Sequence, residues 1–268
     1  MESKATQRSS LRLPDSELVV HLVEDRRATI SPWGRGNSKI GPTVFTYSKL
    51  PGRVGGTCPG SSPECEMICY VKRVVTTSPP VWDLWTRNTL RRDEVPPLPE
   101  GAETVRFHVS GDFDTVPYIV NWCKLVNCHP DVAFFGYTRS WRVPELLPWL
   151  TRLHDYRNVQ LFASVDKTID ELPPDGWRRA WLETDPRAAL VPHELDLERQ
   201  GRYDERIRTE AEQGLLMKMV EERGQHNFES VGGARSYVCP EETGRKPNCT
   251  SCNYCITGQR GDVIFLEH

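Results

Sequence analysis

Three apolar runs recur at a fixed interval, and this interval most restricts the folds open to the chain. They read VRFHVSGD, VAFFGYTR and VQLFASVD, and they begin 27 residues apart at Val105, Val132 and Val159. Each is rich in Val, Phe and Leu and ends in polar or glycine residues, which is typical of a buried strand. The segments between them, PYIVNWCKLVNC and PELLPWLTRLHD, open with proline and carry apolar residues at helical spacing. This alternation predicts right-handed parallel βαβ units, in a barrel or in an open doubly wound sheet.

The flanking segments extend the same pattern. We expect a first strand over Val44–Lys49 and a helix after it over Trp82–Arg92. Farther along, we expect a strand or helix over Trp177–Glu183, a charged helix over Glu205–Arg223 and a final strand over Asp262–Glu267. Residues 1–17 are polar without periodicity, which predicts a flexible N-terminal arm.

Composition limits the class of protein. A chain of 268 residues with 38% hydrophobic and 26% charged residues fits one large α/β domain better than two small ones. No apolar run is long enough for a membrane span, and the polar start lacks the apolar core of a signal peptide, so we expect a cytoplasmic protein without a membrane partner. The net charge of -3 argues against wholesale phosphate binding. The net charge does not exclude a local basic patch, so nucleic acid stays a possible partner.

Seven of the nine cysteines fall into two groups, which indicates metal binding in a reducing compartment. The early group, Cys58, Cys65 and Cys69, has the spacing C-x6-C-x3-C in a loop rich in glycine and proline. Three thiolates leave one metal position open for a substrate or cofactor. A surface loop with incidental thiols is the alternative reading of this group.

The late group has four cysteines, enough to close a site. Cys239, Cys249, Cys252 and Cys255 have the spacing C-x9-C-x2-C-x2-C. Zinc sites usually use two separated C-x2-C pairs, whereas a C-x2-C-x2-C triple holds three corners of a cubane in bacterial ferredoxins. The spacing therefore favours a [4Fe–4S] cluster, with zinc as the alternative.

Polar residues close each of the predicted strands. Catalytic groups of parallel α/β folds gather at the carboxyl ends of the strands, so Ser110, Gly111 and Asp112 after one strand and Ser164 and Asp166 after another are candidate site residues. The alternative for either aspartate is that it caps the following helix, as aspartate often does. His108, within a strand, is either a site residue or a hydrogen-bonded core histidine.

This order of features resembles the radical S-adenosylmethionine enzymes, in which a three-cysteine loop follows the first strand and a glycine–acid pair ends the second. The resemblance implies a partial (β/α) TIM-like barrel with an open [4Fe–4S] cluster on Cys58, Cys65 and Cys69, to which S-adenosylmethionine binds. It implies a contact from Gly111 and Asp112 to the cofactor's amine, and contacts from Ser164 and Asp166 to its ribose or carboxylate. The late cysteines match the auxiliary cluster of some members, but the superfamily's own spacing is C-x3-C-x2-C.

More closely, the strings NSKIGPTVFTYSKLPGRVGGTCPG, RFHVSGDFD, YTRSW and CPEETG resemble an uncharacterised family encoded by actinobacterial phages and mobile elements. The two resemblances together predict an arm over 1–17, a partial barrel over 18–230 with its cysteine loop at 57–70, and a cysteine-rich segment over 231–268. The cytoplasm would then be that of an infected bacterium.

We therefore expect one or two [4Fe–4S] clusters, and an enzyme if Asp112 and Asp166 act on bound S-adenosylmethionine. The rival hypotheses are a non-catalytic metal protein that binds a host protein or nucleic acid, and an electron-transfer module with two clusters and no substrate pocket.

Overall fold

The computed structural model describes residues 31–53, 56–190, 192–202, 215–258 and 261–266. The chain divides into two compact units, Met1–Ser31 and Pro32–His268, and all the described helices and strands belong to the second. The predicted arm over 1–17 and residues 205–214 of the predicted charged helix lie outside the described residues.

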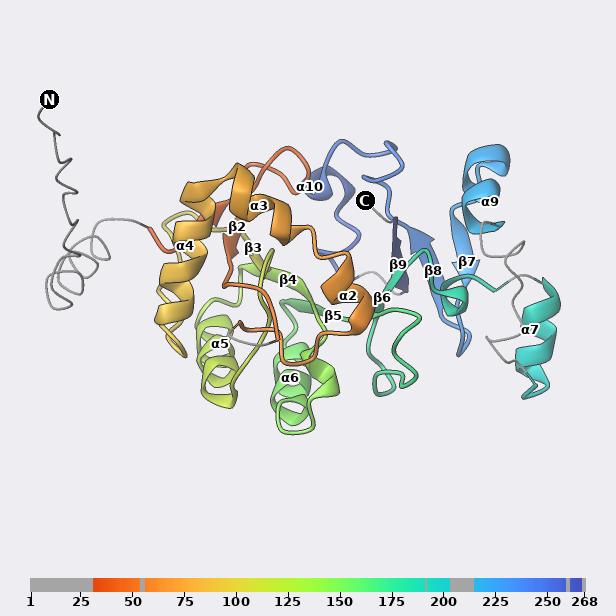
Figure 1. Ribbon diagram of the computed structural model, residues 1–268, viewed down its shortest axis with the longest axis horizontal. Coiled ribbons are helices and arrows are strands. Elements are labelled where there is room, and N and C mark those ends of the chain that lie inside the picture. The colour runs from red at the N-terminus through yellow and green to blue at the C-terminus, as the bar shows by residue number, and fades with distance from the viewer. Residues whose placement is uncertain (1–30, 54–55, 191, 203–214, 259–260, 267–268) are drawn as a thin grey trace, which may run out of the picture. The chain divides into compact units, whose positions relative to one another are not determined.

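A mostly parallel sheet forms the centre of the second unit (Figure 1). Among the described residues it has nine strands in the order β1-β2-β3-β4-β5-β6-β9-β8-β7. Only β1 and β7, the two edges, run antiparallel to their neighbours. The strands are β1 (Gly34–Arg35), β2 (Phe45–Tyr47), β3 (Thr104–Phe107), β4 (Ala133–Thr138), β5 (Val159–Val165), β6 (Arg179–Leu182), β7 (Asn227–Glu229), β8 (Arg235–Val238) and β9 (Asp262–Phe265).

The order of the strands follows the chain from β2 to β6. A doubly wound sheet would reverse direction at a switch point, and this part of the sheet does not. The predicted mixed α/β class with parallel strands is therefore confirmed, and the segment over 177–183 forms a strand. The predicted boundary at residue 231 stays a prediction, although β8 and β9 from beyond it belong to this same sheet.

Helices lie between many of the strands along the chain, and α5 and α6 cover one face of the sheet. In chain order they are α2 (Pro63–Met67), α3 (Val71–Thr77), α4 (Pro79–Leu90), α5 (Val116–Cys128), α6 (Leu147–His154), α7 (Pro192–Arg199), α9 (Leu215–Arg223) and α10 (Cys249–Cys252), with short 3-10 turns at Ser140–Arg142 and Pro186–Ala188. Prolines open α4 and α5, where the first N–H groups of a helix have no partner within it. Thr115 caps α5 by accepting a hydrogen bond from the Tyr118 amide.

Alternation along the strands divides the core between the two faces. On the helix side, Val105 and Phe107 of β3 and Phe134 of β4 pack with Trp122 of α5 and the other members of the main core cluster. On the opposite face, Phe135 of β4 packs with Ile40, Val44 and Ile256. The late cysteine segment therefore covers the face that the helices leave open.

His108 is a core histidine. Its side chain is 5% exposed, its Nε2 lies 2.9 Å from the Tyr118 hydroxyl, and its ring meets that of Phe113 edge to face. Burial, followed by the positive charge of Lys49, lowers the pKa of His108 to about 3. The ring is therefore neutral in the folded protein and not a proton donor at neutral pH.

His108 should make folding pH-dependent. Its folded pKa lies below its unfolded value, so the unfolded chain binds the extra proton and stability falls as pH drops from about 6.5 toward 3. His108→Asn removes the titrating group, and asparagine tolerates the φ of 41° at this position. In urea unfolding, we expect the free energy of unfolding of the wild type to fall by about 1 kcal/mol per pH unit more than that of the variant between pH 6 and pH 4.5. Parallel pH profiles would contradict this assignment.

Candidate metal centre

The early cysteines lie at the carboxyl ends of the strands, where the sequence placed them. Cys65 belongs to α2, Cys58 precedes it and Cys69 follows it. Each of the three thiols is partly buried and free of disulfides. Burial raises the pKa of Cys58 and of Cys65, and negative charge on Cys69 and Asp112 raises both further. The three thiols and this carboxylate therefore form one group.

Backbone hydrogen bonds join the loop of the early cysteines to β2 and β3. Thr57, which precedes Cys58, donates its amide to the Leu50 carbonyl at 3.2 Å, and its carbonyl accepts the Asp112 amide at 3.0 Å. The Lys49 amide donates to the Ser110 carbonyl at 3.0 Å. The first part of the cysteine loop is thus held against the Ser110–Asp112 turn.

Asp112 is a buried carboxylate with four protein donors. One oxygen accepts from the Thr138 hydroxyl at 2.6 Å and the Phe113 amide at 2.7 Å, and the other from the amides of Arg139 at 2.8 Å and Ser140 at 3.2 Å. Burial raises the pKa of Asp112 to about 6 although these hydrogen bonds oppose it. In this geometry Asp112 positions the end of β4, and none of its oxygens lacks a donor.

Asp166 positions the helix that carries Cys65. Its carboxylate accepts from the Ser62 hydroxyl at 2.5 Å, and Ser62 in turn caps α2 by accepting from the Cys65 amide at 3.1 Å. The Arg139 guanidinium pairs with the same carboxylate and contacts the Cys65 thiol. Burial alone would raise the pKa of Asp166, but Arg139 and the hydroxyls of Ser62 and Thr168 outweigh it, and the pKa is lowered.

Two buried hydroxyls beside this group have no hydrogen-bond partner among the described residues. They belong to Ser110, which is 3% exposed, and Ser140, which is fully buried. Burying an unpaired hydroxyl costs about 1–3 kcal/mol, so such groups mark places where a ligand can bind. Ser164 lies in β5, where its carbonyl accepts from the Trp141 indole at 3.1 Å.

The late cysteines form a second group, on the other side of the sheet from α5 and α6. Cys249 and Cys252 bound α10, and Cys239 follows β8. Besides burial, negative charge on Cys249 and Cys252 raises the pKa of Cys255, and negative charge on Cys255 raises that of Cys239. The four thiols therefore lie in one region. Burial raises the pKa of both Cys239 and Cys255 to about 12.

Cations and N–H groups surround the late thiols. Arg106 and Lys39 lower the pKa of Cys249 against the effect of burial, and Arg178 does the same for Cys255. The Tyr137 hydroxyl also bonds to Cys255. The Cys249 amide donates to the Lys39 carbonyl at 2.9 Å, which ties α10 to the segment before β2. Burial outweighs these cations, so the pKa of Cys249 and Cys255 stays above the usual value of a thiol. The cations would stabilise the thiolates once a metal displaces their protons.

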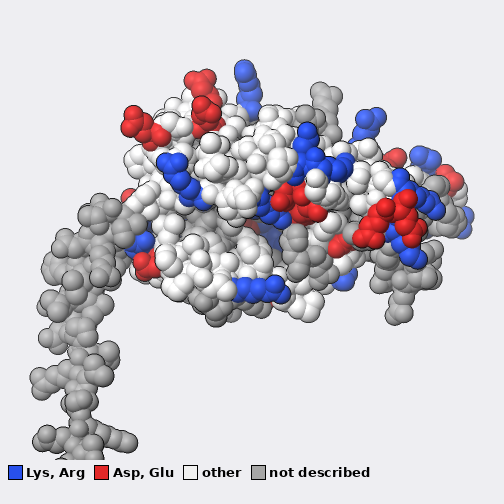
Figure 2. All heavy atoms as spheres, turned by 90° about the horizontal axis from the view of Figure 1, so that it is seen from above, with Lys and Arg blue, Asp and Glu red and all other residues white. Residues whose placement is uncertain are grey.

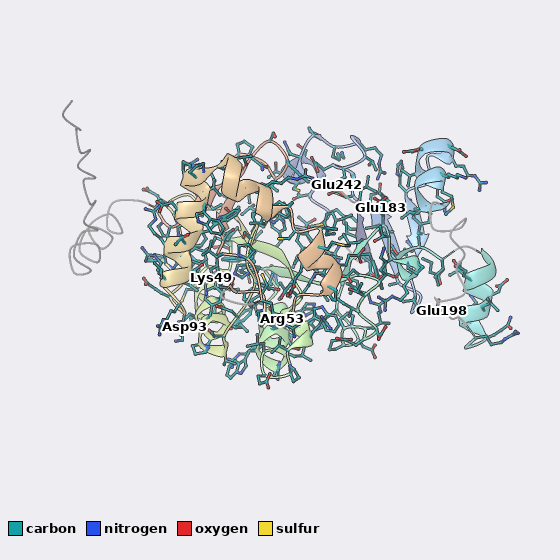
Figure 3. All side chains as sticks on the ribbon, viewed as in Figure 1. Lys49, Arg53, Asp93, Glu183, Glu198 and Glu242 are labelled. Atoms are coloured by element: carbon teal, nitrogen blue, oxygen red, sulfur yellow. The ribbon has the colours of Figure 1, made fainter. Side chains whose placement is uncertain are left out.

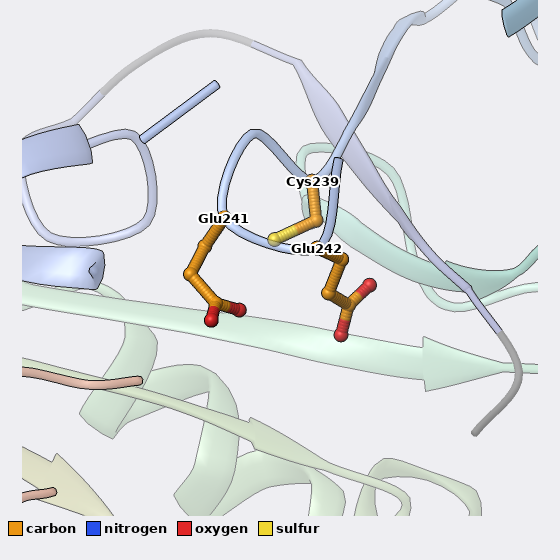
Figure 4. A group of neighbouring side chains, drawn as sticks. All are labelled: Cys239, Glu241 and Glu242. Atoms are coloured by element: carbon orange, nitrogen blue, oxygen red, sulfur yellow. The ribbon is translucent and has the colours of Figure 1, made fainter. Parts of the chain in front are cut away.

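Cys239 also lies in a compact group of possible metal ligands. One ligand atom each from Cys239, Glu241 and Glu242 lies within 4.8 Å of the others, all from one turn (Figure 4). The Lys39 ammonium, however, lies 2.9 Å from a Glu242 oxygen and 3.5 Å from a Glu241 oxygen. The turn's backbone N–H groups bond to the Cys239 sulfur. The single charge of Lys39 is shared between the two carboxylates, so the group keeps a net negative charge, and Cys239, Glu241 and Glu242 all stay candidate ligands.

A buried ion pair near the strand ends was not found from the sequence. The Lys49 ammonium is fully buried and lies 2.9 Å from Asp114, 2.7 Å from the Arg92 carbonyl and 3.5 Å from the Tyr118 ring centroid. Figure 3 places Lys49 and Asp93 on the side of α4 and α5. Burial lowers the pKa of Lys49, although Asp114 opposes this. A single lysine after a short strand carries no sequence signal for such a role.

The fold and the two cysteine groups define a mixed α/β protein with a candidate metal centre on a mostly parallel sheet. The model of the Gene product 88 family matches residues 24–258, and the chain belongs to that family. It is 27% identical over 153 residues to the Gene 88 protein of Mycobacterium phage L5 and 26% identical over 151 residues to that of Mycobacterium phage D29. Each alignment covers 49% of this chain and 60% of the relative. The chain matches no solved structure.

The expected relation to a phage protein family is thereby confirmed, whereas none of these matches is to a radical S-adenosylmethionine enzyme. Within the described residues, no helix is long and apolar enough to cross a membrane.

Replacing Gly111 should destabilise the protein for steric reasons. Its φ is 76°, and an added Cβ would lie 2.5 Å from the Thr57 hydroxyl and 3.0 Å from Lys49 atoms. Gly101, with φ of 71° and nothing within 4 Å of its added Cβ, is the matched control. We expect Gly111→Ala to destabilise the protein by roughly 2 kcal/mol more than Gly101→Ala in denaturant unfolding. Equal losses would mean that the cysteine loop does not pack against this turn.

Proposed function

We propose that this Gene product 88 family member binds two [4Fe–4S] clusters. The early cluster would be held by Cys58, Cys65 and Cys69, and the late one by Cys239, Cys249, Cys252 and Cys255. The observation that carries the proposal is the separation of the seven thiols into a group of three at the strand ends and a group of four on the open face. Three ligands leave one iron open, and four close a cluster.

The late cysteines have the spacing C-x9-C-x2-C-x2-C along the chain, and this spacing favours a cluster over zinc. Zinc sites usually use two separated C-x2-C pairs, whereas a C-x2-C-x2-C triple holds three corners of a cubane in bacterial ferredoxins. Arg106, Arg178 and Lys39 would offset the negative charge of a thiolate-bound cluster.

We further propose that the early site is radical-SAM-like, on a sheet related to a partial (β/α) barrel. The support is the sequential strand order from β2 to β6, and a three-cysteine loop that follows β2 and packs against the Gly111–Asp112 turn. With one electron from an external low-potential donor, a cluster with an open iron at this place would supply reductive cleavage of a sulfonium C–S bond of bound S-adenosylmethionine. The unpaired hydroxyls of Ser110 and Ser140 would serve as polar contacts for that cofactor.

A second candidate is a metal protein that acts by binding rather than by catalysis. The four protein donors on Asp112 favour it, because they leave this carboxylate no free oxygen for the amine of a cofactor. In that case Asp112 and Asp166 position the cysteine loop, and the clusters stabilise the fold. The partner would be a macromolecule of the bacterial host.

Iron and acid-labile sulfide analysis of anaerobically purified protein tests the cluster proposal. We expect about eight irons and eight sulfides per chain in the wild type, because each cubane holds four of each. Cys58→Ser/Cys65→Ser should lose one cluster, and Cys249→Ser/Cys252→Ser the other. Cys128→Ser, in the exposed thiol at the end of α5, is the control and should lose neither. Zinc without sulfide would overturn the proposal.

The same samples separate the two candidate functions. After reduction, S-adenosylmethionine should change the electron paramagnetic resonance signal of the wild type and of the late double variant. A signal that does not respond, in protein with full iron content, would contradict the radical-SAM-like reading and leave the binding function.

A further inference from the structure

A hollow of about 510 Å³ lies at the β7–β8 edge of the sheet, beside the late cysteines. This volume falls in the range that holds small ligands. Its walls come from three places in the chain: the edge strands, the turn after Cys239, and the end of α10. The lining residues are Asn227, Arg235, Ser236, Tyr237, Pro240, Arg245, Lys246, Cys252 and Tyr254.

The charge of this lining is positive. Arg235, Arg245 and Lys246 contribute three cations, and among the described residues no aspartate or glutamate lines the hollow. The whole chain, in contrast, has a net charge of -3, and on the face in Figure 2 basic and acidic side chains are interspersed. The nearby carboxylates of Glu241 and Glu242 pair with Lys39. A concave cationic site on a net-negative protein selects anions.

Arg245 is held in place before any ligand binds. Its guanidinium donates to the Tyr237 hydroxyl at 2.7 Å, the Val238 carbonyl at 2.9 Å and the Thr243 hydroxyl at 3.0 Å. A guanidinium fixed in this way binds an anion with little further loss of side-chain entropy. Arg235 and Lys246 are exposed and add charge at the rim.

Aromatic rings form the other part of the lining. Tyr237 and Tyr254 are stacked, with centroids 5.4 Å apart and an interplanar angle of 24°. The Arg245 guanidinium lies 4.8 Å from the Tyr237 ring centroid. Asn227 and Ser236 add polar groups to the same wall. The Arg178 guanidinium lies 5.2 Å from the Tyr254 ring centroid, so the stacked pair offers a base the edges of its rings. Cations beside aromatic rings are a combination by which proteins bind single-stranded nucleic acid, since the phosphates meet the cations.

We propose that this hollow binds the phosphate and base of a nucleotide, either free or as a unit of single-stranded nucleic acid. Arg235, Arg245 and Lys246 contact the phosphate, and the tyrosine pair contacts the base. Cys252 belongs both to this lining and to the proposed late cluster, whereas Arg235, Arg245, Lys246 and the two tyrosines belong to the hollow alone.

Fluorescence anisotropy of a short labelled oligothymidine with the full-length protein tests this site. The variant Arg235→Gln/Lys246→Gln changes exposed rim residues only, so folding should be preserved. The control, Arg199→Gln/Arg202→Gln, removes the same charge from exposed positions in and after α7. We expect the rim variant to bind about 10-fold more weakly, and its log–log salt slope to be smaller by about 0.7 per lost charge. The control should match the wild type.

Competition identifies the source of the ligand. Displacement by thymidine monophosphate supports a free nucleotide, and displacement only by unlabelled oligomer supports a single strand. Equal displacement by polyglutamate would show a general anion surface and overturn the inference. Absence of binding by the wild type, or equal weakening in both double variants, would also overturn it.

Discussion

Two buried carboxylates, Asp112 and Asp166, hold the strand ends and the early cysteine loop in one arrangement. A buried carboxylate is tolerated only when donors surround it, and each of these accepts four hydrogen bonds from the protein. Phe113 and Thr168 are donors that follow the carboxylates closely in the chain, and the other donors come from β4, from the loop after it, and from Ser62 before α2. Satisfying the carboxylates therefore fixes these segments relative to one another. Arg139 belongs to both sets, since its amide bonds to Asp112 and its guanidinium to Asp166. The geometry of the early thiols is thus a consequence of charge burial.

The opposite face of the sheet carries a different kind of constraint. The late cysteine segment packs on Phe135, Tyr137 and Phe162 of β4 and β5, while the helices occupy the other face. Arg106 and Arg178 project into this layer, where the rings of Tyr137 and Phe162 lie under their guanidinium groups at 5.4 Å and 4.1 Å. Cations on an apolar sheet need nearby anions or π-systems, and the thiols of Cys249 and Cys255 are among the groups that interact electrostatically with these two arginines. The segment over 231–268 and the sheet therefore depend on each other.

Periodicity made the central strands and helices predictable. The strand patterns at 105, 132 and 159 correspond to β3, β4 and β5, and the helical patterns between them to α5 and α6. The edges were not predictable, because β1 and β7 are two and three residues long and carry no period. The position of β9 between β6 and β8 could not be predicted from the sequence either, because long-range pairing sets the order of the strands. Lys49 was missed for the same reason: its partners Asp114 and Arg92 are distant in the chain.

The sequence by itself determined the class of the fold, the grouping of the cysteines and the candidates Ser110, Gly111, Asp112, Ser164 and Asp166, because each of these depends on local pattern or on spacing. Only the tertiary structure decided what those residues touch. It gave Asp112 four donors, left the Ser110 hydroxyl unpaired, and placed the early thiols beside Asp112 and the late thiols beside Arg106 and Arg178. The physical reason is that hydrogen-bond satisfaction and burial are properties of contacts between distant segments, which a linear pattern does not record.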